Sequence, residues 1–130
     1  MEATMIKCET NYGSIQHYMI GWANFPKLLE QPHVQAGIHP FVVVSNNDCN
    51  KHSPVVTVIQ ITSKDSNPWL PTHYTLDFKQ ANEVGLYKKS VIKAESITSI
   101  GKSIILRMNG ILTEDAQKEV DRIIRRQLGL

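Results

Sequence analysis

The chain has 130 residues, 42% of them hydrophobic and 20% charged, so it is too apolar for a disordered protein and long enough for one domain over residues 1–130. Its net charge of +2 does not by itself indicate nucleic-acid binding, although residues 51–130 hold twelve basic and eight acidic residues against two and four in residues 1–50. No apolar run approaches the roughly 18 residues of a membrane span, and the first ten residues do not resemble a secretory signal. We therefore expect a cytoplasmic protein with no membrane partner.

Short segments rich in β-branched residues make up most of the chain and predict strands. In chain order they cover residues 14–20, 40–44, 54–62, 72–78, 90–94, 97–100 and 102–108. The polar residues 45–48 predict a turn that closes the second strand. Short strands with little room for helices between them predict a mainly β fold, a small barrel or sandwich rather than a parallel sheet.

The C-terminal segment is the exception and predicts a helix. Thr113 is a favourable N-cap, and Glu114 and Asp115 place negative charge on the first turn, where the helix dipole favours it. Apolar residues then recur at helical spacing up to Gly129, a typical helix end; they are Ala116, Val120, Ile123, Ile124 and Leu128. We expect this stripe to pack on the β-structure. The arginines of the helix are expected to form a solvated face rather than an RNA patch; they are Arg122, Arg125 and Arg126.

Two long loops, residues 24–38 and 63–71, lack strong periodicity. Loops of this kind on a compact β fold are where binding usually occurs. Trp69 lies in the second loop between Pro68 and Pro71. It either plugs the loop from below or stacks on a base of a single-stranded nucleic acid.

Three stretches of the chain carry motifs whose order and spacing are informative together. Residues 37–46 read G-I-H-P, an apolar run and Ser-Asn, and residues 50–73 contain N-K-H-S-P, an apolar strand, I-T-S and L-P-T-H. Residues 85–102 contain G-L, S-V and I-T-S-I-G-K. These stretches resemble the G-x-R-P, N-R-x-S, I-T-S, L-P-T-H and I-R-T-I-D-K segments of the MazF/PemK toxin family, and the resemblance runs from about Tyr12 to Leu130.

The resemblance implies a fold, an activity and partners. The fold would be a compact SH3-like barrel with a C-terminal α-helix, assembled as a homodimer. The activity would be that of an endoribonuclease toxin of a type II toxin–antitoxin system, which cleaves single-stranded RNA such as mRNA without a metal or other cofactor. A cognate antitoxin would lie across the active groove, with DNA contacted only indirectly through the antitoxin complex. In agreement, no Cys/His spacing in the chain resembles a zinc site.

RNA cleavage of this kind makes the ribose 2′-OH attack the adjacent phosphate, which needs a base, an acid and donors to the phosphorane. Carried over from the I-T-S motif, the catalytic candidates are Thr62 and Ser63 beside it. The arginine of G-x-R-P is replaced here by His39. A histidine exchanges a proton near neutral pH and an arginine does not. His39 therefore either takes over the acid or base role, or its presence leaves a weak or silent relative.

Further candidates come from the same resemblance. In place of the family's S-E-Q-x-G the chain has H-V-Q-A-G, so the acid is missing, Gln35 matches, and His33 is a second acid/base candidate. Lys93 and Glu95 lie where PemK-like relatives place an Arg and an Asp. Two residues apart on a strand, they share a face. They either serve the RNA site or form only an exposed surface ion pair of small energetic value. The RNA-binding candidates are Gln35, Trp69, Lys93 and Glu95. Three histidines are expected to be structural: His17, His52 and His73.

Two other functions are compatible with the same fold, because fold does not determine function. One is a CcdB-like protein that poisons a topoisomerase by binding it and has no nuclease activity. The other is a catalytically weakened relative that binds RNA or antitoxin. The Thr62–Ser63 pair opposite an imidazole favours the nuclease, because a topoisomerase poison does not need it.

Overall fold

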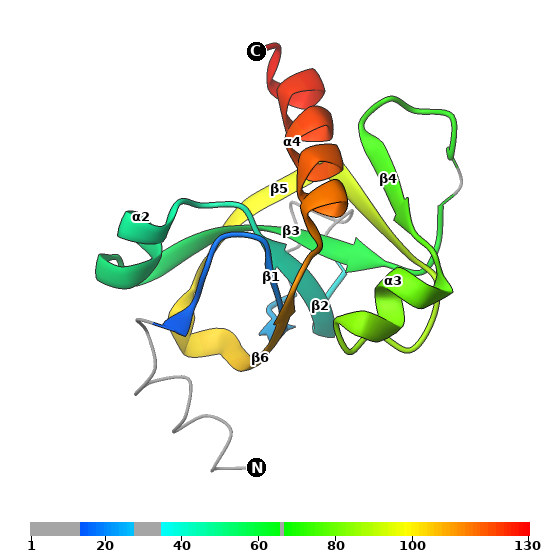
Figure 1. The fold of residues 1–130 in the computed structure, drawn as a ribbon. Coiled ribbons are helices and arrows are strands. Elements are labelled where there is room, and N and C mark those ends of the chain that lie inside the picture. The colour runs from blue at the N-terminus through cyan, green and yellow to red at the C-terminus, as the bar shows by residue number, and fades with distance from the viewer. Residues whose placement is uncertain (1–13, 28–34, 66) are drawn as a thin grey trace.

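The computed structural model describes residues 14–27, 35–65 and 67–130, and their strands form one six-stranded antiparallel sheet in the order β4-β5-β3-β2-β1-β6 (Figure 1). The elements are β1 (Met19–Phe25), β2 (Gly37–Val43), α2 (Asn47–His52), β3 (Val55–Thr62), β4 (His73–Leu76), α3 (Phe78–Glu83), β5 (Ser90–Gly101), the 3₁₀ turn η2 (Lys102–Ile104), β6 (Ile105–Ile111) and α4 (Glu114–Leu128). The mainly β fold with a C-terminal helix is confirmed. The sheet is strongly curved but open, with β4 and β6 at its edges, so the barrel is incomplete in its strand pairing.

Both faces of the sheet are buried, which explains the unbroken apolar runs in its central strands. On β2, Val42 belongs to one apolar cluster, whereas Phe41 and Val43 belong to a second. On β3, Ile59 and Ile61 join the first cluster, whereas Val56 and Val58 join the second. Alternate residues of a strand point to opposite faces. A sheet covered on one face only would have required polar residues at every second position.

The C-terminal helix forms as predicted and covers the first cluster. Thr113 caps α4 through its side chain, which accepts the N–H of Ala116, and Gly129 ends it in the left-handed conformation with φ 73°. Val120 and Ile123 are fully buried. Leu128, also predicted to pack, is 54% exposed and lies beyond the sheet contact. The side chains of Arg122, Arg125 and Arg126 are exposed, as expected of a solvated face.

Two predicted strands differ at their ends. The first is β1 at Met19–Phe25 rather than residues 14–20, because the chain turns at His17 and Tyr18, and Tyr18 adopts φ 70°, which a strand cannot accommodate. The last begins with η2, not with extended chain. Lys102 is 1% exposed there, and its ammonium donates to the carbonyl of Asn50.

Two short helices were not predicted. α2 replaces the expected turn at residues 45–48, and the side chain of Asn46 caps it by accepting the N–H of Cys49. α3 takes the end of the segment predicted as a strand over 72–78, and Asp77 and Gln80 form a reciprocal capping box at its start. Each helix has six residues, too few for helical periodicity to show. The capping residues Asn46 and Asp77 were the sequence signal from which these two helices could have been predicted.

The segments predicted as two strands, residues 90–94 and 97–100, are one strand, β5, with an irregular register. Ile59 pairs with Ile97 and Ile61 pairs with Ile92, so four residues of β5 lie opposite the single residue Gln60 of β3. The irregular segment, residues 93–96, bulges out of the ladder where the predicted strands were separated.

Among the described residues no helix is long and apolar enough to cross a membrane.

Candidate functional site

Two neighbouring pockets lie where β2 and β3 cease to pair. The ladder between these strands runs from Val43↔Val58 to Phe41↔Gln60 and goes no further. Beyond it lie a pocket of about 340 Å³ and a second of about 310 Å³, which share Gln35, Thr62 and Lys64. We call the two together the groove. Thr62 and Lys64 form the wall between its halves.

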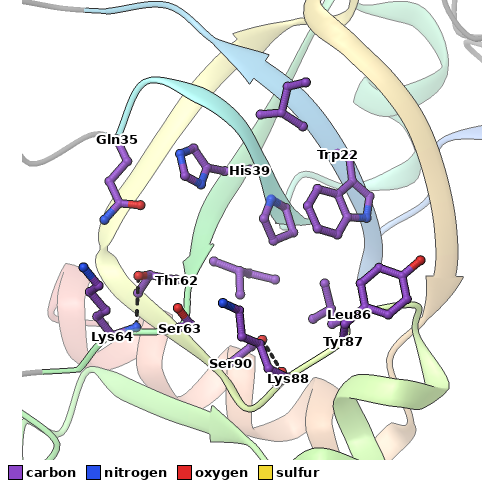
Figure 2. Close-up of a pocket in the computed structure, with 13 residues that line it drawn as sticks. Trp22, Gln35, His39, Thr62, Ser63, Lys64, Leu86, Tyr87, Lys88 and Ser90 are labelled. Carbon is purple, nitrogen blue, oxygen red and sulfur yellow. Dashed lines mark hydrogen bonds between the residues drawn. The ribbon is translucent and has the colours of Figure 1, made fainter. Parts of the chain in front are cut away.

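The first half is mostly apolar, and we call it the apolar pocket. Its lining combines apolar and polar side chains: Trp22, Gln35, Ile38, His39, Pro40, Ile61, Thr62, Ser63, Lys64, Leu86, Tyr87, Lys88 and Ser90. Figure 2 shows His39 and Trp22 on one side, with Thr62, Lys64 and Lys88 across from them. The apolar pocket therefore holds three of the predicted catalytic residues, His39, Thr62 and Ser63.

The second half is polar, and we call it the polar pocket. It is lined by Gln35, Gln60, Thr62, Lys64, Asn67, Lys93, Glu95 and Ser96. Its residues from β5 come from the bulged segment, residues 93–96. Together the halves hold three lysines and one glutamate, a positive balance that suits a phosphate backbone or an acidic peptide.

His39 is held by one hydrogen bond. Its Nε2 lies 2.9 Å from the carbonyl oxygen of Ala36. A carbonyl only accepts, so Nε2 carries the hydrogen and donates. In the neutral ring, Nδ1 is then the nitrogen that can take a proton, which fits a base better than a donor to phosphate.

Thr62 is oriented by the loop that follows it. Its Oγ1 accepts the backbone N–H of Lys64 at 3.2 Å. The hydroxyl hydrogen stays available to an oxygen in the groove, because a hydroxyl both accepts and donates. Lys64 follows on the same short turn, which places an ammonium-bearing side chain beside the hydroxyl.

Gln60 holds the opposite loop in place. The residue is only 8% exposed, and its side-chain amide donates to the carbonyl of Gln35 at 2.8 Å and accepts the Gln35 N–H at 3.2 Å. The two bonds replace the ladder where β2 and β3 have separated. Gln35 thus reaches the groove through its backbone contact with Gln60.

Glu95 contacts the buried side chain of His73 and does not form the surface ion pair considered for Lys93. Its carboxylate accepts from His73 at 2.6 Å and from the hydroxyl of Thr72 at 2.8 Å. Burial would raise the pKa of Glu95, but the hydrogen bonds from His73, from its own backbone and from Thr72 outweigh burial and lower it. Glu95 is therefore held as a carboxylate at the edge of the polar pocket.

Comparison with known proteins identifies the family. Residues 17–128 match the model of the PemK-like, MazF-like toxins of type II toxin–antitoxin systems. The chain belongs to this family. The predicted resemblance is confirmed over nearly all of the described part of the toxin.

Solved structures share the fold of this toxin. A MazF from Deinococcus radiodurans is 22% identical and matches with a TM-score of 0.68 over 89% of this chain and 97% of that one. The Mycobacterium tuberculosis toxin MazF-mt6 is 20% identical, with a TM-score of 0.67 over 86% and 97%. An endoribonuclease in complex with its cognate antitoxin, from a Mycobacterial species, is 20% identical with a TM-score of 0.68 over 89% and 96%.

The remaining predicted residues divide into three groups. Gln35, Lys93 and Glu95 line the polar pocket of the toxin. Trp69 is 73% exposed and lines neither pocket, so it does not plug its loop from below. His33 lies outside the described residues.

Several groove residues were missed from the sequence of the toxin; they are Trp22, Gln60, Lys64, Asn67, Tyr87, Lys88 and Ser96. Lys64 directly follows the I-T-S motif and could have been found from that position alone. Gln60 gives no such signal, since its role depends on Gln35, which is 25 residues away in the chain.

Proposed function

We propose that this toxin is an endoribonuclease that cleaves single-stranded RNA at the wall between the two pockets. The observation that supports this most directly is that Thr62 and Lys64 line both pockets while His39 lines the adjoining apolar one. A phosphate at this wall would meet a hydroxyl, an ammonium and an imidazole together. The family and the endoribonucleases of the same fold point to the same activity.

The proposed reaction is attack of the ribose 2′-oxygen on the adjacent phosphorus. The bond from O2′ to phosphorus forms and the bond to O5′ breaks, which leaves a 2′,3′-cyclic phosphate and a 5′-hydroxyl. Nδ1 of His39 takes the proton from the 2′-OH, and Thr62 and Lys64 donate to the phosphorane oxygens. The leaving O5′ takes a proton from the ammonium of Lys64, and the hydroxyl of Ser63 is a second hydrogen-bond donor on that side of the wall.

The two pockets also suggest how the strand lies. The aromatic rings of Trp22 and Tyr87 in the apolar pocket suit an unstacked base, and the lysines of the polar pocket suit the backbone that follows. Bases of a duplex are not free to enter such a pocket. Single-stranded RNA is therefore the expected substrate.

The direct test is incubation of the purified toxin with a long single-stranded RNA, followed by analysis of the ends. We expect cyclic phosphate and 5′-hydroxyl ends, with cleavage that persists in EDTA because the chain supplies every group named above. Thr62→Val keeps the β-branched shape, removes the donor and should lower the rate at least about tenfold. Cleavage by Thr62→Val at the wild-type rate would point to a contaminating nuclease. Inhibition of a topoisomerase without RNA cleavage would favour the CcdB-like alternative.

We also propose that a cognate antitoxin covers the same groove in the cytoplasm. An acidic segment that orders on binding would pair with Lys64, Lys88 and Lys93, and part of its binding energy would be spent on ordering. Competition between this segment and RNA for the toxin should be complete. Independent binding of both would refute a shared site.

A further inference from the structure

The ring of His73 lies between two carboxylates. Nδ1 is 3.0 Å from Oδ1 of Asp65, and Nε2 is 2.6 Å from Oε2 of Glu95. The His73 side chain is 2% exposed, against 9% for Asp65 and 39% for Glu95. Both carboxylates can accept at once only if both ring nitrogens carry hydrogen. His73 therefore connects the loop after β3 to β5 through one charge-assisted hydrogen bond to a carboxylate on each.

The contacts of Asp65 lead from His73 to the wall of the groove. Oδ1 of Asp65 also accepts the backbone N–H of Asn67 at 3.0 Å. On its other side Asp65 follows Lys64, whose N–H donates to Thr62. Lys64 and Asn67 both line the polar pocket. The position of Asp65 thus fixes the backbone positions of Lys64 and Asn67.

The other end of the cluster is anchored in the sheet. Glu95 lies in the bulge of β5 and also accepts from Thr72, and His73 pairs with Lys93 across the β4–β5 ladder. These contacts give His73 a fixed support. The loop beyond β3 is mostly exposed and has less packing of its own to hold it.

We propose that His73 is a positioning residue of the groove, which sets the place of Lys64 against the RNA phosphate by binding Asp65 and Glu95 at once. The inference rests on the proposed function and deepens it. It gives His73, expected to be structural, a role in the proposed reaction. A lysine has a long flexible stem, so its charge acts on the transition state only if its backbone is held, and a displacement of about 1 Å can cost about 10²-fold in rate.

The test compares His73→Gln with His52→Gln in single-turnover cleavage at saturating RNA. Glutamine cannot bridge both carboxylates, whereas His52 is exposed on α2 and lines neither pocket. We expect His73→Gln to lower the rate about 10- to 100-fold with little change in RNA affinity, and His52→Gln to match wild type. In a Lys64→Ala background His73→Gln should have almost no further effect, because residues that act together are not additive. A His73→Gln enzyme at the wild-type rate, or a loss that is equal with and without Lys64, would overturn the proposal.

A second measurement does not depend on cleavage. Amide hydrogen exchange at Asn67 should become faster in His73→Gln, since Asp65 loses its support, while exchange in the core strands stays the same. If His73→Gln fails to fold, Asp65→Ala replaces it, with the same expected loss of rate and faster exchange. Unchanged exchange at Asn67 in a folded variant contradicts the positioning role. If exchange at Asn67 is faster in His73→Gln but the wild-type toxin cleaves no RNA, the contact of His73 with Asp65 still holds the loop. The proposed function is then refuted instead.

Discussion

His39 replaces the arginine of the family motif, and its geometry decides what it can do. Nε2 is committed to the carbonyl of Ala36, and Nδ1 is the nitrogen that remains for proton transfer. A guanidinium would supply a fixed charge at this point instead. Lys64, on the facing wall, supplies a cation by a different route. In the proposed mechanism, base and cation are thus on separate residues.

We predict that His39→Ala lowers the cleavage rate about 10² to 10⁴-fold, the range for losing one proton-transfer group, with a much smaller change in RNA affinity. Wild-type cleavage should vary with pH near neutrality, because imidazole exchanges a proton there. His39→Arg should fail to restore that profile. Rates are to be measured in single turnover across the neutral range.

Two results would separate the interpretations of His39. Higher activity in His39→Arg than in wild type would mean that the natural residue is a loss of the family's cation and not a replacement base. Equal cleavage by His39→Ala and wild type would remove His39 from the mechanism. His33, and Lys93 with Glu95, would then be the candidates to test next.

At the scale of elements, the groove exists because two strands depart from regular pairing. Residues 37–40 of β2 do not pair with β3, and β5 bulges opposite Gln60. Gln60 then bonds to the backbone of Gln35, so the opening is held at a fixed width by a side chain. Regular pairing would have closed the space that the two pockets occupy.

A hydrogen bond joins the turn before β1 to α4. The hydroxyl of Tyr18 donates to Oδ1 of Asp121 at 2.7 Å, and the ring of His17 stacks on that of Tyr18 with centroids 3.7 Å apart. Burial, with the hydrogen bond to Asp121 and its charge, raises the pKa of Tyr18 to about 12. The folded state therefore holds the phenol in its neutral form above the pH at which the unfolded chain ionises.

We predict that Tyr18→Phe loses a stabilising contribution that is present in the wild type below about pH 10 and fades as the pH rises to about 12. The free energies of unfolding of wild type and variant should thus differ at pH 8 and converge in alkali, as followed by urea titration. The matched control is Tyr87→Phe, whose side chain is 74% exposed and whose hydroxyl has no hydrogen bond among the described residues. A constant difference between wild type and Tyr18→Phe across this range would contradict the assignment.

At the scale of the whole molecule, the chain leaves several large apolar side chains in solvent. They include Ile38, Val55, Phe78, Tyr87, Ile111 and Leu128, each at least 42% exposed. Some of these belong to the groove, where a ligand would cover them. A second subunit that covered some of the rest would remove that apolar surface from water, which is favourable.

We predict a homodimer at micromolar concentration, with a mass about twice that of the 14.7 kDa chain. Sedimentation equilibrium measures this mass directly. The reason is the exposed apolar surface together with membership of the family. A mass near 14.7 kDa over the whole concentration range would show that the toxin is a monomer.

The sequence by itself determined those features whose signals are local. The cap at Thr113, the apolar stripe and Gly129 act within one helix, so α4 was predictable almost to the residue. The β-branched runs placed most strands, and the motif order placed His39, Thr62 and Ser63 at one site. Local caps at Asn46 and Asp77 would also have revealed the two short helices.

Only the tertiary structure decided which distant residues meet. Gln60 meets Gln35, His73 joins Asp65 to Glu95, and Tyr18 reaches Asp121, which is 103 residues away in the chain. The contacts of Gln60 and His73 depend on strand register, since a shift of one residue turns every side chain to the opposite face. No local pattern encodes that register. His73 was therefore assigned a generic structural role from the sequence, whereas in the fold it lies between two carboxylates, one on the loop after β3 and one in the sheet.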